Sequence, residues 1–182
     1  MRPLPEYKVE KQHVTIPVKL EGYQSAFIVF RRPAIGKMIG VNFPKLKPLQ
    51  MLNKPWMVQF DTAMRGPLKA VVFNKLEDWT RHVNANIKYY SGPAVYKTTF
   101  VVNNLPGGER FLLNLGSVKV MATVKVNGKN TGTAWTAPWQ VDITEALKKG
   151  ENKLEIEVVN TWVNRLIGDS KLPRTNGKPG PM

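Results

Sequence analysis

The sequence predicts an all-β fold: a jelly-roll β-sandwich preceded by a small β-hairpin segment. Apolar side chains alternate with Lys and Thr over residues 118–126, and with Glu from Leu154 to Val158. Such alternation is typical of strands with one buried face and one wet face. Asn127-Gly128 is a strong signal for a tight turn between strands. The 14 glycines and 14 prolines among 182 residues also fit a turn-rich β domain.

Residues 1–55 are expected to form a β-hairpin segment and a linker, and could be the remnant of a preceding β domain. Apolar and polar residues alternate over 14–20, which predicts a short strand. A turn at Gly22-Tyr23 should lead into a second strand over 25–30. The Pro- and Lys-rich residues 36–55 have no period, which indicates a linker.

The main domain is expected over residues 56–173, followed by a flexible tail over 174–182. Short, closely spaced strands with little helix favour a sandwich or jelly roll. Strands are predicted at 56–60, 69–73, 95–102, 111–115, 118–126, 139–141 and 154–160, and short turns or helices at 76–80 and 144–148. The core is expected to include Trp56, Val58, Phe60, Val95, Val120, Val124, Leu154 and Ile156.

The net charge of +14 is spread over both halves of the chain. One interpretation is a polyanionic partner, such as nucleic acid, an acidic glycan or an anionic membrane. The alternative, which we favour, is a basic exported protein with solvated lysines on its strand faces. Nucleic-acid-binding barrels interleave aromatic and basic side chains on one strand face, and Lys97, Lys119 and Lys125 lack this pattern. A nucleic-acid partner is therefore disfavoured.

Composition also limits the compartment and the kinds of site. The chain has no cysteine, so disulfides and thiolate metal sites are excluded. No apolar run approaches the ~20 residues of a membrane helix, and we expect no membrane partner. The first ten residues, MRPLPEYKVE, lack the apolar centre of a signal peptide. We expect a periplasmic or extracellular location, as part of a larger secreted enzyme that carries the signal.

Several short motifs, weak singly and specific together, resemble one domain family. The first set resembles the sugar-binding-type, galactose-binding-like jelly roll of family 2 glycoside hydrolases: Asn127-Gly128, Gly132, Pro138-Trp139, Asp142-Ile143-Thr144, Gly150-Glu151-Asn152 and Leu154. A fuller set is similar to the C-terminal β-sandwich of bacterial enzymes resembling family 106 α-L-rhamnosidases: Trp56, Phe60-Asp61, Gly66-Pro67, Leu76 to Trp79, Tyr89 to Gly92, Ala94 to Tyr96, Leu115-Gly116 and Asn160 to Asp169.

The resemblance implies a non-catalytic module of a bacterial polysaccharide-degrading hydrolase, because the catalytic machinery of that family lies in a separate barrel. The module would bind glycan or brace the barrel, so the expected partners are a glycan and the catalytic barrel of a parent hydrolase. Two alternatives stay open. The chain could contribute residues to a glycosidase active site completed by another domain, or it could be a basic nucleic-acid-binding β domain.

Residue by residue, we expect no catalytic group in this chain. Glycoside hydrolysis generally needs two opposed carboxylates, and among four Asp and nine Glu only Glu77-Asp78 forms an acidic pair beside an aromatic, Trp79. His13 and His82 are isolated and lack metal-ligand spacing. No cofactor is expected. A structural calcium, to which Asp61 or Asp169 could contribute, is the one metal site considered.

The candidate carbohydrate-binding or domain-interface residues are Trp135, Trp162, Asn164, Arg165 and Asp169. Trp135 lies in an expected loop, where it could stack on a sugar or plug the open end of the sandwich. The run from Asn160 to Asp169 is read as an exposed polar loop suited to polyol recognition or domain docking. The resemblance implies that Asn164, Arg165 and Asp169 face a barrel. The alternative is a local Arg165–Asp169 pair that stiffens the loop.

Overall fold

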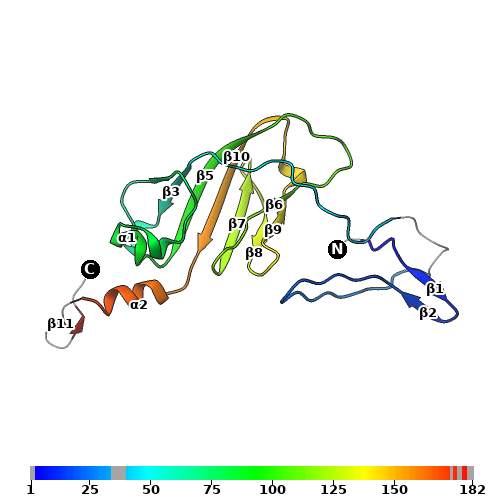
Figure 1. Ribbon diagram of the computed structural model, residues 1–182, viewed down its shortest axis with the longest axis horizontal. Coiled ribbons are helices and arrows are strands. Elements are labelled where there is room, and N and C mark those ends of the chain that lie inside the picture. The colour runs from blue at the N-terminus through cyan, green and yellow to red at the C-terminus, as the bar shows by residue number, and fades with distance from the viewer. Residues whose placement is uncertain (1–2, 34–39, 173, 176–177, 180–182) are drawn as a thin grey trace. The chain divides into compact units, whose positions relative to one another are not determined.

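The computed structural model describes residues 3–33, 40–172, 174–175 and 178–179 (Figure 1). The chain divides into two compact units, Met1–Met51 and Leu52–Met182. We had expected a boundary between residues 55 and 56, and the division lies slightly earlier in the chain.

In its described residues, 3–33 and 40–51, the first unit contains one short β-hairpin. Strands β1 (Lys8–Glu10) and β2 (His13–Thr15) pair antiparallel across a turn in which Lys11 has a φ of 54°. The predicted strands over 14–20 and 25–30 are therefore wrong in position. β2 ends two residues before Pro17, whose nitrogen cannot donate to a ladder. The turn at Gly22-Tyr23 does form, but the described residues on either side of it belong to no strand.

A six-stranded antiparallel sheet forms the centre of the second unit. Its strands follow the order β4 (Val71–Phe73), β3 (Trp56–Phe60), β5 (Pro93–Val102), β10 (Gly150–Val159), β7 (Met121–Val126) and β8 (Lys129–Ala134). β5 and β10 pair over all ten residues of each strand and lie at the centre of the sheet in Figure 1. Paired residues on neighbouring strands point to the same face of the sheet, so the pairing shows which side chains share a face.

A second layer of strands covers part of the core face of this sheet, and short helices lie in the connections and after the last strand of the sheet. Strands β6 (Leu112–Asn114) and β9 (Gln140–Asp142) pair antiparallel as a separate sheet. The helices are η1 (Thr62–Met64), η2 (Trp79–Arg81), α1 (Ala85–Lys88), η3 (Thr144–Ala146) and α2 (Val163–Asp169). Strands β11 (Arg174–Thr175) and β12 (Lys178–Pro179) form a minimal final pair. The expected all-β sandwich is confirmed.

The core lies between the sheet and its cover, and it is rich in aromatic side chains. Phe60 contacts Phe73, Trp79 and Tyr90 in tilted or edge-on geometries, with ring centroids 4.9 to 6.4 Å apart. The indole N–H of Trp79 donates to the hydroxyl of buried Tyr96. Burial raises the pKa of the Tyr96 phenol to about 12, so this hydroxyl stays neutral at physiological pH.

Two of the predicted core residues are wrong and the other six are buried. Val95 pairs with Gln59 and Glu157, on the opposite face from buried Ala94 and Tyr96, and is only half-buried. Val120 lies outside β7 with a φ of 86°, and its side chain is exposed. The left-handed backbone at Val120 breaks the alternation that had extended the predicted strand back to residue 118.

Several elements of the second unit were not predicted as such, among them β8, α1 and α2. β8 carries the sequence KNTGTA, whose Lys, Asn and Gly disfavour strands, so the Asn127-Gly128 turn was its only signal. α1 begins at the Asn84 cap, whose side chain accepts a hydrogen bond from Asn86 N–H at 2.9 Å. The predicted flexible tail over 174–182 lies partly outside the described residues and stays a prediction.

Candidate functional site

The segment expected as an exposed polar loop is instead a helix fixed to the end of the sheet. Just before it, the Asn160 side chain accepts a hydrogen bond from Gly92 N–H and donates one to the carbonyl of Tyr90, both at 2.9 Å. α2 then begins within three residues, and Figure 1 shows β10 leading into it. The amide of Asn160 therefore clamps the start of the helical segment to the turn before β5.

Arg165 points toward the domain rather than into solvent, because its side chain is only 15% exposed. Its guanidinium Nε lies 3.1 Å from a carboxylate oxygen of Asp169, one helical turn later. Gly168, on the same side of the helix, is buried, and Asn164 is half-buried. The polar side chains of this segment were expected to face a ligand, and this is wrong for Arg165, whose guanidinium is turned toward the domain. The observed contact is the alternative, a local ion pair between Arg165 and Asp169.

The exposed face of α2 is apolar. The four large side chains that share this face are Trp162, Val163, Leu166 and Ile167, and the most exposed are Trp162 at 67% and Leu166 at 63%. Their spacing follows the period of a helix, and the opposite face carries Arg165, Gly168 and Asp169. α2 is thus amphipathic, but its apolar face points to solvent and its polar and small residues point toward its own domain.

Trp135 lies at the same end of the sheet as α2. Ala134 pairs with Ala122 on β7, and the neighbouring Met121 pairs with Val159, the last residue of β10. The Trp135 side chain is 74% exposed, so it does not plug the sandwich. Trp139, by contrast, packs against the core, as predicted. We call Trp135, Trp162, Val163, Leu166 and Ile167 the α2 platform.

Sequence reasoning found two of these five residues, Trp135 and Trp162, and missed the three aliphatic ones. The signal was present, because Val163, Leu166 and Ile167 recur at helical spacing. It was overlooked because Asn, Arg and Asp in the same run resemble a loop. The platform brings Trp162 together with its apolar neighbours, whereas Asn164, Arg165 and Asp169 lie on other parts of the helix.

The acidic residues considered for catalysis have structural partners. Asp78 caps η2 by accepting hydrogen bonds from the backbone N–H and hydroxyl of Thr80, at 3.0 and 2.8 Å. Those bonds lower the pKa of the Asp78 carboxyl, with the backbone bond contributing most. Its neighbour Glu77 lies 3.8 Å from the Nε2 of His82. The Glu77-Asp78 pair therefore organises a turn rather than facing a second carboxylate.

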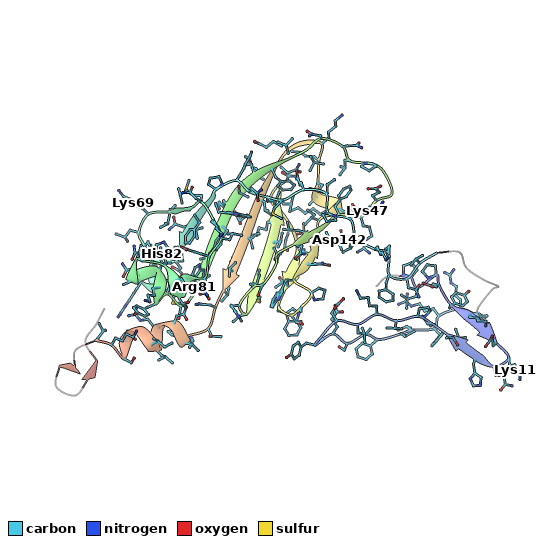
Figure 2. All side chains as sticks on the ribbon, in the orientation of Figure 1. Lys11, Lys47, Lys69, Arg81, His82 and Asp142 are labelled. Atoms are coloured by element: carbon cyan, nitrogen blue, oxygen red, sulfur yellow. The ribbon has the colours of Figure 1, made fainter. Side chains whose placement is uncertain are left out.

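Asp142, on β9, is likewise engaged. Burial raises the pKa of its carboxyl, but hydrogen bonds from Thr144 and Arg110 outweigh burial, so the pKa lies below its ordinary value. The Arg110 guanidinium contacts one Asp142 oxygen at 2.6 and 3.0 Å. Figure 2 shows Asp142 on the β6–β9 side of the domain, and Arg81 and His82 together beside α1. These groups do not converge on one site.

The two carboxylates considered for calcium each have another partner, and the calcium site stays a prediction. Asp61 caps η1, accepting a bond from Ala63 N–H at 2.8 Å, and Asp169 is paired with Arg165. Within the described ranges, no group of three or more His, Cys, Asp or Glu side chains could hold an ion. In that same part of the chain, no helix is long and apolar enough to cross a membrane.

Sequence comparison shows the family to which the chain belongs. Residues 74–179 match the family described as "Glycosyl hydrolase 2 galactose-binding domain-like". The chain belongs to this family. This galactose-binding-like domain is also 42% identical, over 148 residues, to a protein of Formosa agariphila named "Putative beta-glucuronidase". That match covers 80% of the chain and 13% of the Formosa protein.

Solved structures agree with this family. A rhamnosidase from Novosphingobium sp. PP1Y is 36% identical, with a TM-score of 0.85 over 94% of this chain and 16% of its own. The β-glucuronidase of Ruminococcus gnavus is 21% identical, with a TM-score of 0.51 over 63% of this chain and 22% of its own, which shows the fold alone. The resemblance to a rhamnosidase-type, galactose-binding-like domain is confirmed, and the domain spans 13–16% of the length of the Formosa and Novosphingobium proteins.

Proposed function

We propose that this galactose-binding-like domain is a non-catalytic module that braces the catalytic domain of a bacterial polysaccharide-degrading glycoside hydrolase. The α2 platform is the surface that would dock on that domain. The observation that carries the proposal is the apolar, exposed face of α2, together with the exposed Trp135 at the same end of the sheet. The family and the much greater length of the relatives support the presence of a catalytic partner.

Energetics favour docking over sugar binding at these residues. Fully burying a large aliphatic or aromatic side chain contributes roughly 1.5–3 kcal/mol, and the platform holds five such side chains. Tryptophan is also among the residues enriched at interface hot spots. A sugar site would need hydrogen-bonding groups around the aromatic rings, yet Arg165 is largely buried and already paired with Asp169. We therefore prefer the bracing role to carbohydrate binding by α2.

The experiment mixes the chain with the catalytic portion of its parent hydrolase, supplied as a separate polypeptide, and measures the Kd by calorimetry. Leu166→Asp should weaken docking at least about tenfold, because a carboxylate would be buried in an apolar contact. The matched control is Leu76→Asp, which changes another exposed leucine that is not part of the α2 platform. Equal affinities for the wild type and Leu166→Asp, with both folded, would overturn the proposal.

The same proposal implies that the isolated domain turns over no glycoside. Aryl rhamnosides, glucuronides and galactosides test this directly, because each releases a coloured phenol. Turnover that disappears in Glu77→Gln or Asp78→Asn would instead support the alternative, in which residues of this chain take part in a glycosidase active site.

A further inference from the structure

A shallow groove lies on the outer face of the six-stranded sheet, the face opposite the core. It has a volume of about 680 Å³. The pairing of the strands determines which side chains form the bottom of this groove. Met57 pairs with Val72 on β4 and with Lys97 on β5, and Glu155 on β10 pairs with both Lys97 and Lys125 on β7. These five side chains therefore form one row across five adjacent strands.

The lining of this groove is strongly cationic. Its described lining residues include four lysines, Lys54, Lys97, Lys125 and Lys153, and one carboxylate, Glu155. Glu155 is shared, because Lys97 and Lys125 each place their ammonium nitrogen 3.3 Å from one of its oxygens. One carboxylate cannot neutralise four ammonium groups, so the groove keeps a net positive charge. We call it the lysine groove.

The lysine groove also offers apolar surface between its charges. Met57 and Val72 are 50% and 55% exposed and lie next to each other on β3 and β4. Trp56, the one aromatic residue among the described lining residues, is buried and presents no open ring face. Without a stacking ring the surface is poorly suited to nucleic-acid bases, which are bound largely by stacking on aromatic side chains.

We propose that the lysine groove binds an acidic glycan. Carboxylate or sulfate groups of the glycan pair with Lys97, Lys125 and Lys153, and the apolar C–H faces of its sugar rings rest on Met57 and Val72. Charge-assisted hydrogen bonds between ammonium and carboxylate are among the stronger hydrogen bonds in proteins. Because the site is open to water, salt screens these contacts, and the affinity falls as ionic strength rises.

This site is independent of the α2 platform. Its row lies on the outer face near the middle of β10, whereas the platform follows the last residue of β10. Loss of docking at α2 would therefore leave glycan binding intact, and the reverse also holds. The lysine groove adds a function to the proposed bracing role, since it would hold a negatively charged polysaccharide on the enzyme.

The test uses the whole chain and titrates it, at low salt, with a tetramer of a uronic acid, a sulfated tetrasaccharide and a neutral tetrasaccharide. A single-stranded DNA oligonucleotide of matched charge is the fourth probe. We expect binding of the uronate or the sulfated probe, weakened severalfold by 150 mM salt, and at least tenfold weaker binding of the neutral one. Which acidic probe binds more tightly identifies the anion that the groove prefers.

Variants decide whether the groove itself is responsible. Lys97→Gln/Lys125→Gln/Lys153→Gln should weaken binding of the acidic probe at least tenfold. The matched control, Lys119→Gln/Lys148→Gln/Lys149→Gln, removes the same charge from exposed lysines outside the groove. It should change the affinity for the acidic probe less than twofold. Lys153→Glu alone serves as a second variant if the triple variant unfolds, and it too should weaken binding. Equal loss in the control, equal binding of the neutral probe, or tighter binding of DNA than of either acidic sugar would each overturn the proposal.

Discussion

The backbone N–H of Arg165 donates a hydrogen bond to the side-chain hydroxyl of Ser91, with 3.0 Å between nitrogen and oxygen. Arg165 is in the first turn of α2, where backbone N–H groups have no partner within the helix. Trp162, the cap residue of α2, makes no side-chain capping bond. Ser91 therefore caps α2 from a turn 74 residues earlier in the chain.

Ser91→Ala should lower the free energy of unfolding by about 1–2 kcal/mol, the usual cost of losing a capping bond to a buried hydroxyl. The amide of Arg165 should also exchange its hydrogen faster, because it loses its acceptor. Denaturant unfolding and hydrogen exchange measure the two effects. Ser117→Ala, at an exposed serine, is the control and should change neither. Unchanged exchange at Arg165 would show that Ser91 does not cap the helix.

Asn160→Ala should destabilise the domain by about 1–3 kcal/mol, because the Gly92 N–H and the Tyr90 carbonyl both lose their partner. Docking through the α2 platform should weaken as well, since α2 would lose its clamp. Chemical denaturation and calorimetry give both values. Asn104→Ala changes an exposed asparagine and should affect neither.

Asn152→Leu should be among the most damaging single substitutions, costing about 3 kcal/mol or more. The Asn152 side chain is fully buried, and its amide bonds with Lys148 N–H, the carbonyls of Lys148 and Gly150, and Asn127. Leucine fits the volume but leaves these groups without partners. Thermal unfolding measures the loss, and Asn103→Leu, at an exposed position, is the comparison. A near-native melting temperature for Asn152→Leu would contradict the argument.

The Asp78 cap should make stability depend on pH in the acidic range. Its folded pKa is lowered from 3.8, chiefly by the Thr80 backbone bond, so the ionised form stabilises the fold above that value. This contribution should disappear as the pH falls from about 4 through the lower folded pKa. Asp78→Asn keeps an acceptor for Thr80 but cannot titrate, and should make the dependence shallower, leaving the part due to other carboxyls with lowered pKa values such as Asp142. Glu109→Gln, which removes an exposed carboxylate, is the control.

Strand positions in the second unit could be predicted because alternation and packing agree there. Trp56, Val58 and Phe60 are buried in β3 as predicted, since period-2 alternation directly records which face meets the core. Val95 shows the limit of that reasoning, because it lies on the outer face of a strand whose two faces both carry apolar residues. Local sequence alone cannot choose between two such faces.

Only part of the candidate site could be predicted, because some of its side chains are oriented by contacts with residues distant in the sequence. Trp135 and Trp162 are exposed, and the sequence marked them as aromatic residues outside the strands. The direction of Arg165 depends on Ser91 and Asp169, and the contact with Ser91 joins residues that are 74 positions apart in the chain. Nothing in the run from Asn160 to Asp169 encodes that distant anchor. The lysine groove was equally hidden, because strand pairing brings Lys97, Lys125 and Lys153 together from distant positions.

The paired strands β5 and β10 carry both proposed surfaces, and this has an evolutionary consequence. From Glu155 to Val159 the β10 backbone advances roughly 13 Å, so the ladder alone sets the spacing between the lysine groove and α2. Insertions in the surrounding loops would leave that spacing unchanged. A one-residue insertion just before Lys153 would turn Lys153 and Glu155 toward the core, unless a bulge such as the one between β7 and β8 absorbed the extra residue. Relatives can therefore differ in loop length while they keep this spacing, whereas a single-residue insertion in β5 or β10 requires a bulge.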